Sequence, residues 1–142
     1  MTTQHKSYIA LMLCVLLLIP CLIVPAGATM RASDIIMSHS CKTSPQGDGE
    51  IAVTFSISAK YPVSQIGVRS MYFLANNGSS WTLEETYTKE DEGMSRTNVG
   101  VHGGTIYYQG TSGVRYKVVV TLFAEDSDGT SDARTYTMYV TA

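Results

Sequence analysis

The feature that most constrains the fold of this chain is a two-residue alternation of apolar and polar side chains, without any sustained helical spacing. It is clearest in residues 114–125, where one face consists of Tyr116, Val118, Val120, Leu122 and Ala124. Successive side chains of a β-strand point to opposite sides of the sheet, so this pattern predicts a strand with one buried face. The opposite face carries Val119 and Phe123 and is partly apolar, so we expect other groups to cover it.

The same alternation predicts further strands, each bounded by turn-forming residues. They are expected at residues 50–59, 65–75, 81–89, 105–109 and 132–140. Tyr61-Pro62 is expected to end the first of these, because proline cannot donate to the ladder. The Asn77-Gly78 pair predicts a hairpin turn. Residues 94–104 are the least regular, and residues 32–41 fit either an edge strand or a single helical turn.

About seven short strands with turns between them are typical of an immunoglobulin-like sandwich. A single flat sheet would leave one apolar face in water, whereas two facing sheets bury both. The sequence therefore predicts an all-β fold, a single antiparallel β-sandwich domain that spans residues 29–142.

Residues 1–28 have the organisation of a cleavable secretory signal peptide. A weakly positive start is followed by an almost purely apolar run over residues 8–24, and Ala26-Gly27-Ala28 supplies the small-x-small pattern before the cleavage site. Cleavage is expected after Ala28. An uncleaved membrane anchor is the alternative, but the run is shorter than a spanning helix and contains Pro20. We expect a secreted protein, extracellular or attached to the cell surface, with no membrane association after cleavage.

Cleavage leaves 114 residues with 12 acidic and 9 basic side chains, a net charge of −3. Such a balance gives no electrostatic footprint for nucleic acid. It also leaves Cys41 as the single cysteine, so no disulfide can form within the chain. The fold must rest on its hydrophobic core, and Cys41 is either a buried apolar residue or a link between two chains.

The run Gly113–Ala124 (GVRYKVVVTLFA), followed by Gly129 in a turn, resembles the last two strands of a fibronectin type III domain. That resemblance implies a sandwich fold. The chain departs from the family in the late position of Trp81 and in lacking Leu-x-Pro before the tyrosine. Together with the closing strand, Arg31-Ala32-Ser33-Asp34 also resembles small exported proteins of clostridial-type bacteria that have no assigned function, which implies a bacterial exported domain.

Aromatic side chains are the main candidate binding groups. A domain of this size cannot bury all of its rings, and exposed rings supply large contact area at low entropic cost. The predicted binding residues are Trp81, Tyr72, Tyr87, Tyr107 and Tyr108, and Tyr139 belongs to the same set of rings. The alternative is that these rings cover the sheet faces.

No catalytic or metal site is predicted. Asp126, Asp128 and Asp132 are close enough in sequence to serve as calcium ligands, but the bidentate glutamate of a full calcium loop is missing, which favours a hairpin turn. His39 and His102 have no partner at ligand spacing, and His102 is expected in an exposed glycine-rich loop. The sequence shows no nucleophile-elbow pattern.

The prediction for function is a non-catalytic extracellular binding module for a protein or a glycan, with no cofactor. Two alternatives stay open. One is a secreted structural or accessory domain that associates with itself, and the other is a small exported hydrolase. A hydrolase would need His39 or His102 close to both a nucleophile and a carboxylate.

Overall fold

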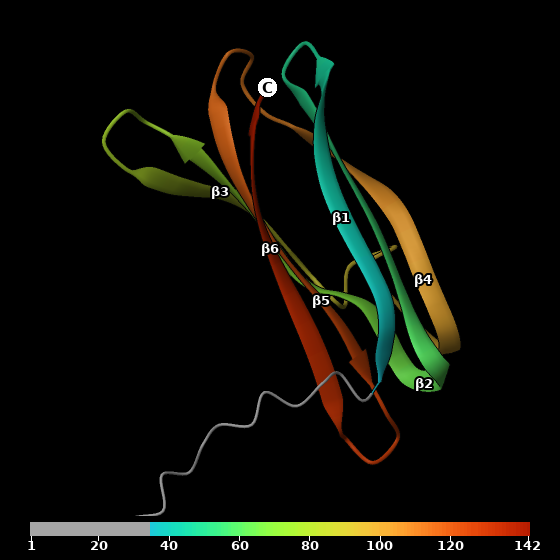
Figure 1. Cartoon of the computed structure of the whole chain (residues 1–142). Helices are drawn as coiled ribbons and strands as arrows, with labels where there is room; N and C mark the ends of the chain where they lie inside the picture. The colour runs from blue at the N-terminus through green and yellow to red at the C-terminus, as the bar shows by residue number, and fades with distance from the viewer. Residues whose placement is uncertain (1–34) are drawn as a thin grey trace, which may run out of the picture. The chain divides into compact units, whose positions relative to one another are not determined.

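A computed structural model describes residues 35–142. The predicted signal peptide, residues 1–28, lies outside the described residues. The described part is all-β and antiparallel, as predicted (Figure 1). Its strands are β1 (Ile36–Gly47), β2 (Glu50–Asn76), β3 (Trp81–Thr88), β4 (Ser95–Gln109), β5 (Arg115–Glu125) and β6 (Ser131–Thr141). They form one curled six-stranded sheet, where about seven strands were predicted.

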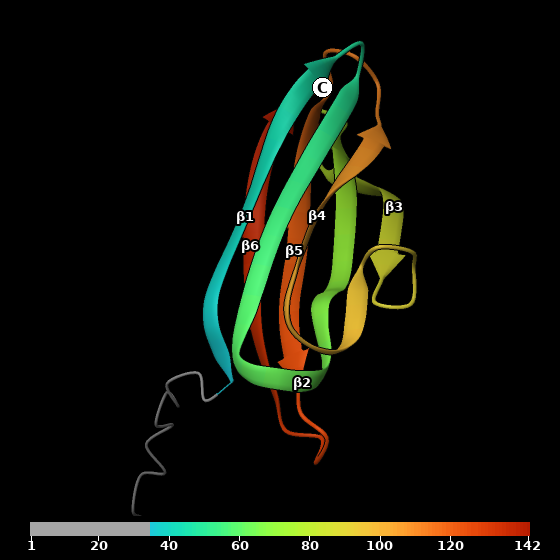
Figure 2. The same ribbon diagram turned by 90° about the vertical axis from the view of Figure 1, so that its right-hand side faces the viewer.

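The strand count differs because β2 is one continuous strand of 27 residues. The prediction that Tyr61-Pro62 ends a strand was wrong. The pairing between β2 and β4 breaks between Ser58 and Val63, so Pro62 lies where the ladder needs no N–H. At this break β2 bends and turns back, as Figure 2 shows at the bottom of the molecule. Two predicted strands, 50–59 and 65–75, are therefore the two arms of β2.

Residues 95–104, predicted to be irregular, are also part of a strand. Glycine is unfavourable in a strand interior, but it allows a close approach between backbones. A Cβ atom added at Gly103 would lie only 2.9 Å from the carbonyl oxygen of Phe55 on β2. Gly103 thus lets β4 pair closely with the first arm of β2, and β4 as a whole pairs with β2 in two stretches, from Ser95 to Val99 and from Val101 to Gln109.

Because β2 bends, the sheet has two halves that face a common core. The first half consists of β1, the first arm of β2 and the second part of β4. The second half consists of β3, the second arm of β2, β5 and β6. The largest fully buried side chains come from both halves and include Ile51, Phe55, Phe73, Tyr116 and Leu122. The predicted buried face of β5 is confirmed.

Side chains also link β1 to β6, although no ladder joins these two strands. The hydroxyl of Tyr136 on β6 lies 2.5 Å from Nδ1 of His39 on β1. Near the start of β1, the backbone N–H of Ile35 donates to the carboxylate of Asp132 at 2.9 Å. Cys41 and Met138 pack against the core in the same region. Among residues 35–142 no helix is long and apolar enough to cross a membrane.

Gly67 generates a prediction about stability. It has a φ of 149°, and a Cβ atom there would lie 2.2 Å from the carbonyl oxygen of Met94. Gly67→Ala should lower the free energy of unfolding by about 3 kcal/mol, since the backbone of Met94 must move. The measurement is urea unfolding followed by tryptophan fluorescence.

Gly129→Ala is the matched control. Gly129 also has a positive φ, 84°, but nothing lies within 4 Å of its Cβ position. The cost should be about 1 kcal/mol, from backbone strain alone. If the two variants lost the same free energy of unfolding, the close contact between β2 and the Met94 backbone would be contradicted.

Candidate functional site

The two halves of the sheet present different outer faces to solvent. On the first half this face is rich in small hydroxyl side chains, including Ser40, Ser56, Thr54 and Thr105. On the second half, rings, aliphatic groups and cations gather. We call this second surface the aromatic face; its residues are Tyr72, Leu74, Trp81, Leu83, Arg115, Lys117, Val119 and Tyr139.

The register of the strands explains how the aromatic face is assembled. Leu83 pairs with Leu74, Leu74 with Lys117, and Lys117 with Tyr139, so one row crosses all four strands. Directly opposite residues of neighbouring strands point to the same side of a sheet. Leu83 and Tyr139 are 54% and 52% exposed, respectively. The row therefore presents apolar surface to solvent at both of its ends.

Four of these side chains form a compact group that we call the cation–aromatic cluster. The ring centroids of Trp81 and Tyr139 are 5.6 Å apart, and their planes are inclined at 50°. The Lys117 ammonium lies 5.2 Å from the Trp81 ring, and the Arg115 guanidinium lies 5.2 Å from the Tyr139 ring. Both distances fall within the range of cation–π attraction. The two rings are tilted and not coplanar, so they do not form one flat platform.

The cations of this cluster are not neutralised by carboxylates. Among residues 35–142 neither Arg115 nor Lys117 forms an ion pair, and the ion pair that does form joins Lys89 and Glu90 at 3.9 Å. Arg115 is exposed and Lys117 half-buried. Two positive charges therefore lie beside the half-buried ring of Trp81 and the exposed ring of Tyr139, in a chain whose net charge is negative.

A second group of cations lies at the other end of the aromatic face, around Phe123. This ring lies on the outer side of β5 but is fully buried. The Arg69 guanidinium lies 4.9 Å and the Lys89 ammonium 5.8 Å from its centroid. These cations are the cover that the partly apolar face of β5 was expected to need, because long basic side chains shield apolar surface with their stems.

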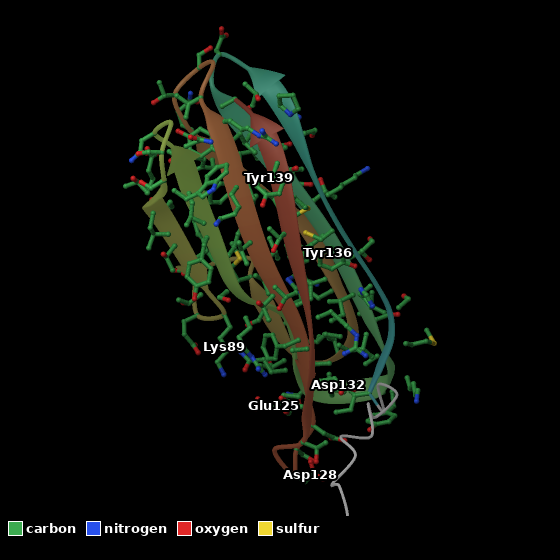
Figure 3. The ribbon with its side chains drawn as sticks, turned by 60° about the vertical axis from the view of Figure 1, so that its left-hand side comes forward. Lys89, Glu125, Asp128, Asp132, Tyr136 and Tyr139 are labelled. Atoms are coloured by element: carbon green, nitrogen blue, oxygen red, sulfur yellow. The ribbon has the colours of Figure 1, made fainter. Side chains whose placement is uncertain are left out.

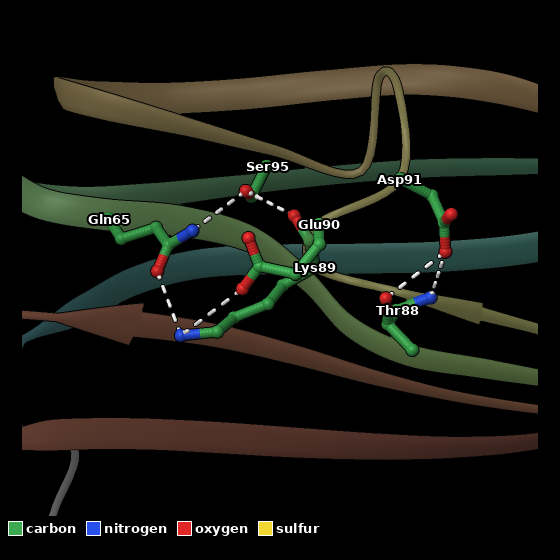
Figure 4. A network of polar contacts seen from close by, with 6 residues as sticks. All are labelled: Gln65, Thr88, Lys89, Glu90, Asp91 and Ser95. Atoms are coloured by element: carbon green, nitrogen blue, oxygen red, sulfur yellow. Dashed lines mark hydrogen bonds and ion pairs between the residues drawn. The ribbon is translucent and has the colours of Figure 1, made fainter.

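Hydrogen bonds hold Lys89 in this position (Figure 4). Its ammonium donates to Gln65 at 3.1 Å, the amide of Gln65 donates to the Ser95 hydroxyl at 3.0 Å, and that hydroxyl donates to the Lys89 carbonyl at 2.7 Å. Asp91 closes the same turn by accepting from the Thr88 N–H at 2.6 Å. The cations around Phe123 thus have hydrogen-bond partners within the described residues, whereas no such bond is seen there for Arg115 or Lys117.

The five predicted binding residues do not share one surface. Trp81 and Tyr72 lie on the aromatic face, and Tyr107, which is 59% exposed, lies on the outer face of the other half. Tyr87 packs against the core, edge-on to Phe73, and Tyr108 is buried and stacked on Phe73 at 4.2 Å. Tyr139 was recognised as an aromatic residue, but Arg115 and Lys117 were missed. The sequence signal for them was the alternation in residues 114–125, which places Arg115 and Lys117 on the face of β5 opposite the core. Tyr139 lies on the same side because it pairs with Lys117.

Two buried tyrosines share one carboxylate at the end of the core. Oε2 of Glu84 accepts from the Tyr108 hydroxyl at 2.7 Å and from the Tyr116 hydroxyl at 3.0 Å. The Tyr116 oxygen also accepts from the backbone N–H of Thr111 at 3.0 Å. Burial, followed by the bond to Glu84, raises the pKa of Tyr108 above its ordinary value. Glu84 thereby ties β3 to β4 and β5 beneath the aromatic face.

The remaining candidate residues have structural contacts. Nε2 of His102 lies 2.8 Å from the Gly93 carbonyl oxygen, and this ring is buried edge-on to Phe55, so the exposed loop predicted for it was wrong. In the described part of the chain neither histidine is hydrogen-bonded to a serine, cysteine or carboxylate.

The acidic turn between β5 and β6 is held by its own carboxylates. Asp126 accepts from the Ser127 N–H at 2.7 Å and Asp128 from the Thr130 N–H at 2.8 Å. Asp128 lies at the tip of the turn, while Asp132 lies beside the start of β1 (Figure 3). Hydrogen bonding to the Thr130 backbone lowers the pKa of Asp128. Among residues 35–142 no three His, Cys, Asp or Glu side chains are grouped as a metal site.

Comparison with known protein families, curated proteins and solved structures finds no match for this chain.

Glu84→Ala should lower the free energy of unfolding by about 2 kcal/mol, because two buried hydroxyls lose their acceptor. Glu84→Gln keeps one acceptor oxygen and should cost about half as much. Urea unfolding of both variants is the measurement. If Glu84→Ala and Glu84→Gln lost the same free energy of unfolding, the role of Oε2 as the acceptor shared by Tyr108 and Tyr116 would be contradicted.

Cys41 should react slowly with alkylating reagents. Burial raises the pKa of its thiol from 9.0 to about 11. Since the thiolate is the nucleophile, the rate of reaction with iodoacetamide should still be rising at pH 10. A plateau below pH 9 would contradict this assignment.

Proposed function

We propose that this chain is an exported, non-catalytic binding module whose aromatic face holds an extracellular ligand. The observation that carries the proposal is the cation–aromatic cluster, in which the half-buried Trp81 and the exposed Tyr139 lie beside two cations that form no ion pair with any of residues 35–142. Folding does not require unneutralised charge beside exposed rings, whereas aromatic and arginine side chains are enriched where proteins bind partners. The rigid sheet beneath them holds these groups in place before the ligand arrives.

Export is part of the same proposal. The apolar run over residues 8–24 and the small residues before Ala28 support a cleaved signal peptide. A binding module without an internal disulfide then depends on its core, and the fully buried side chains of both sheet halves supply one. A bacterial origin, as the Arg31–Asp34 resemblance implies, belongs to the proposal too.

We further propose that the curled sheet is a variant of the immunoglobulin-like sandwich. In that fold a tyrosine at the start of a late strand bonds back to the backbone a few residues upstream. Tyr116 lies at the start of β5, and its hydroxyl is bonded to the Thr111 backbone at 3.0 Å. This contact supports the fibronectin-like pattern of residues 113–124.

Self-association is less well supported. β3 is an edge strand with exposed Leu83, but it also carries Glu84 and Glu85 and is paired with a register shift, features that oppose edge-to-edge pairing. Cys41 is half-buried with a raised pKa, which disfavours a disulfide between two chains. Size-exclusion chromatography should give the same elution volume under reducing and oxidising conditions.

The test of the binding proposal uses Trp81→Ala. The protein is screened against a glycan array and a set of purified surface proteins, and the variant should lose at least tenfold in affinity for whichever ligand is bound. Tyr107→Ala is the matched control, because it removes an exposed ring from the other half of the sheet. Its affinity should stay within twofold of the original. Absence of any ligand, or equal losses in both variants, would refute the proposal.

A further inference from the structure

Half of the positive charge of residues 35–142 lies on the outer side of the second half of the sheet. Four of the eight lysines and arginines in residues 35–142 lie there, namely Arg69, Lys89, Arg115 and Lys117. Two of them, Arg69 and Lys89, cover Phe123 and have polar partners of their own. Arg115 and Lys117 are the cations available to a ligand, so this end of the face is complementary to negative charge.

The backbone beneath the cluster restricts the kind of ligand. β2 and β5 are paired on both sides at this point, since Leu74 pairs with Leu83 and Lys117, and Lys117 with Tyr139. An extended peptide that adds to a sheet needs a free edge, and the centre of this face offers none. A ligand that lies across the centre of this face is therefore recognised by side chains.

The side chains on offer combine three kinds of contact. Trp81 and Tyr139 supply flat apolar surface, and Arg115 and Lys117 supply charge. The next rows along the face add hydroxyls, including Thr86, Thr137, Thr121 and Thr135. A sugar ring has an apolar C–H face and a rim of hydroxyls, and an acidic sugar adds a carboxylate or sulfate. Arginine binds two oxygens of a carboxylate or of a sulfate through two parallel hydrogen bonds.

We infer that the cation–aromatic cluster is a binding site for an acidic glycan, with a sugar ring against Trp81 and Tyr139 and its anionic group on Arg115 and Lys117. This inference rests on the proposed function and names the ligand class of the same face. The inclination of 50° between the two rings suits successive sugars of a twisted chain, each lying against one ring. The two cations, on alternate residues of β5, then meet anionic groups on the same side of that chain.

The test is isothermal titration with hexasaccharides of stated chemistry. The acidic probes are oligogalacturonate, oligomannuronate and chondroitin sulfate hexamers, which distinguish carboxylate from sulfate. The matched neutral probe is the fully methyl-esterified galacturonate hexamer, and poly-glutamate of equal charge is the anionic probe without sugar rings. At least one acidic hexamer should bind, at least tenfold more tightly than the ester and poly-glutamate, and its affinity should fall as salt rises.

Variants localise the contact. Arg115→Gln and Lys117→Gln should each weaken the bound acidic hexamer at least tenfold, and Arg115→Lys should restore part of the loss. Arg69→Gln is the matched control: it removes the same charge from another arginine that lies over a ring, that of Phe123, about 26 Å from Arg115 along β5. Its affinity should change less than twofold. Equal losses for Arg115→Gln and Arg69→Gln would reduce the effect to net charge and overturn the inference.

Three further outcomes overturn the inference. They are equal binding of the methyl ester, equal binding of poly-glutamate, and no binding of any acidic hexamer at millimolar concentration. None of these by itself refutes the binding module, which fails when no ligand of any class binds or when Trp81→Ala and Tyr107→Ala lose equal affinity. Because Arg115 is exposed, its variants should fold normally, and unchanged urea unfolding is the check.

Discussion

The fold depends on the bend in β2, because this strand belongs to both halves of the sheet. Its first arm pairs with β1 and β4, and its second with β3, β4 and β5. The apolar residues of the two arms face each other across one core. Residues 35–142 contain a single cysteine, Cys41, and it is free, so the two halves of this part of the chain are joined by the continuous backbone of β2 and by the core. The aromatic face is the outer side of the second arm and of β3, β5 and β6, which are built onto that arm, so its position depends on the same bend.

Two polar anchors fix the strands that flank this arm. At one end Glu84 accepts from Tyr108 and Tyr116, which attaches β3 to the core. At the other end the bonds among Lys89, Gln65 and Ser95 attach the turn that follows β3. Buried hydroxyls that lack partners are costly, so each anchor favours a single position of β3. Trp81 opens this strand and therefore holds a fixed place beside Tyr139.

The sequence predicted the fold class well because alternation reports burial directly. The face from Tyr116 to Ala124 and the hairpin at Asn77-Gly78 both match the structure. Pro62 and the glycines around His102 misled the prediction, since local propensity there opposes strand formation. Pairing between residues far apart in the sequence overrides this local propensity. Pro62 lies at a gap in the ladder between β2 and β4, and Gly103 allows β4 to approach Phe55 closely. Such contacts have no signature in a short window of sequence.

The binding residues were harder to predict than the strands for a related reason. An aromatic residue in a strand is equally compatible with either face, and only the register separates Tyr108, stacked in the core, from Trp81. A register shift between Phe73 and Leu74 places Glu84 on the core side and Leu83 on the outer face. Lys117 and Arg115 then lie beside the rings because of pairing across four strands, β3, β2, β5 and β6. The face is a property of the assembled sheet, and its unpaired cations distinguish it from Phe123, whose covering cations are already engaged.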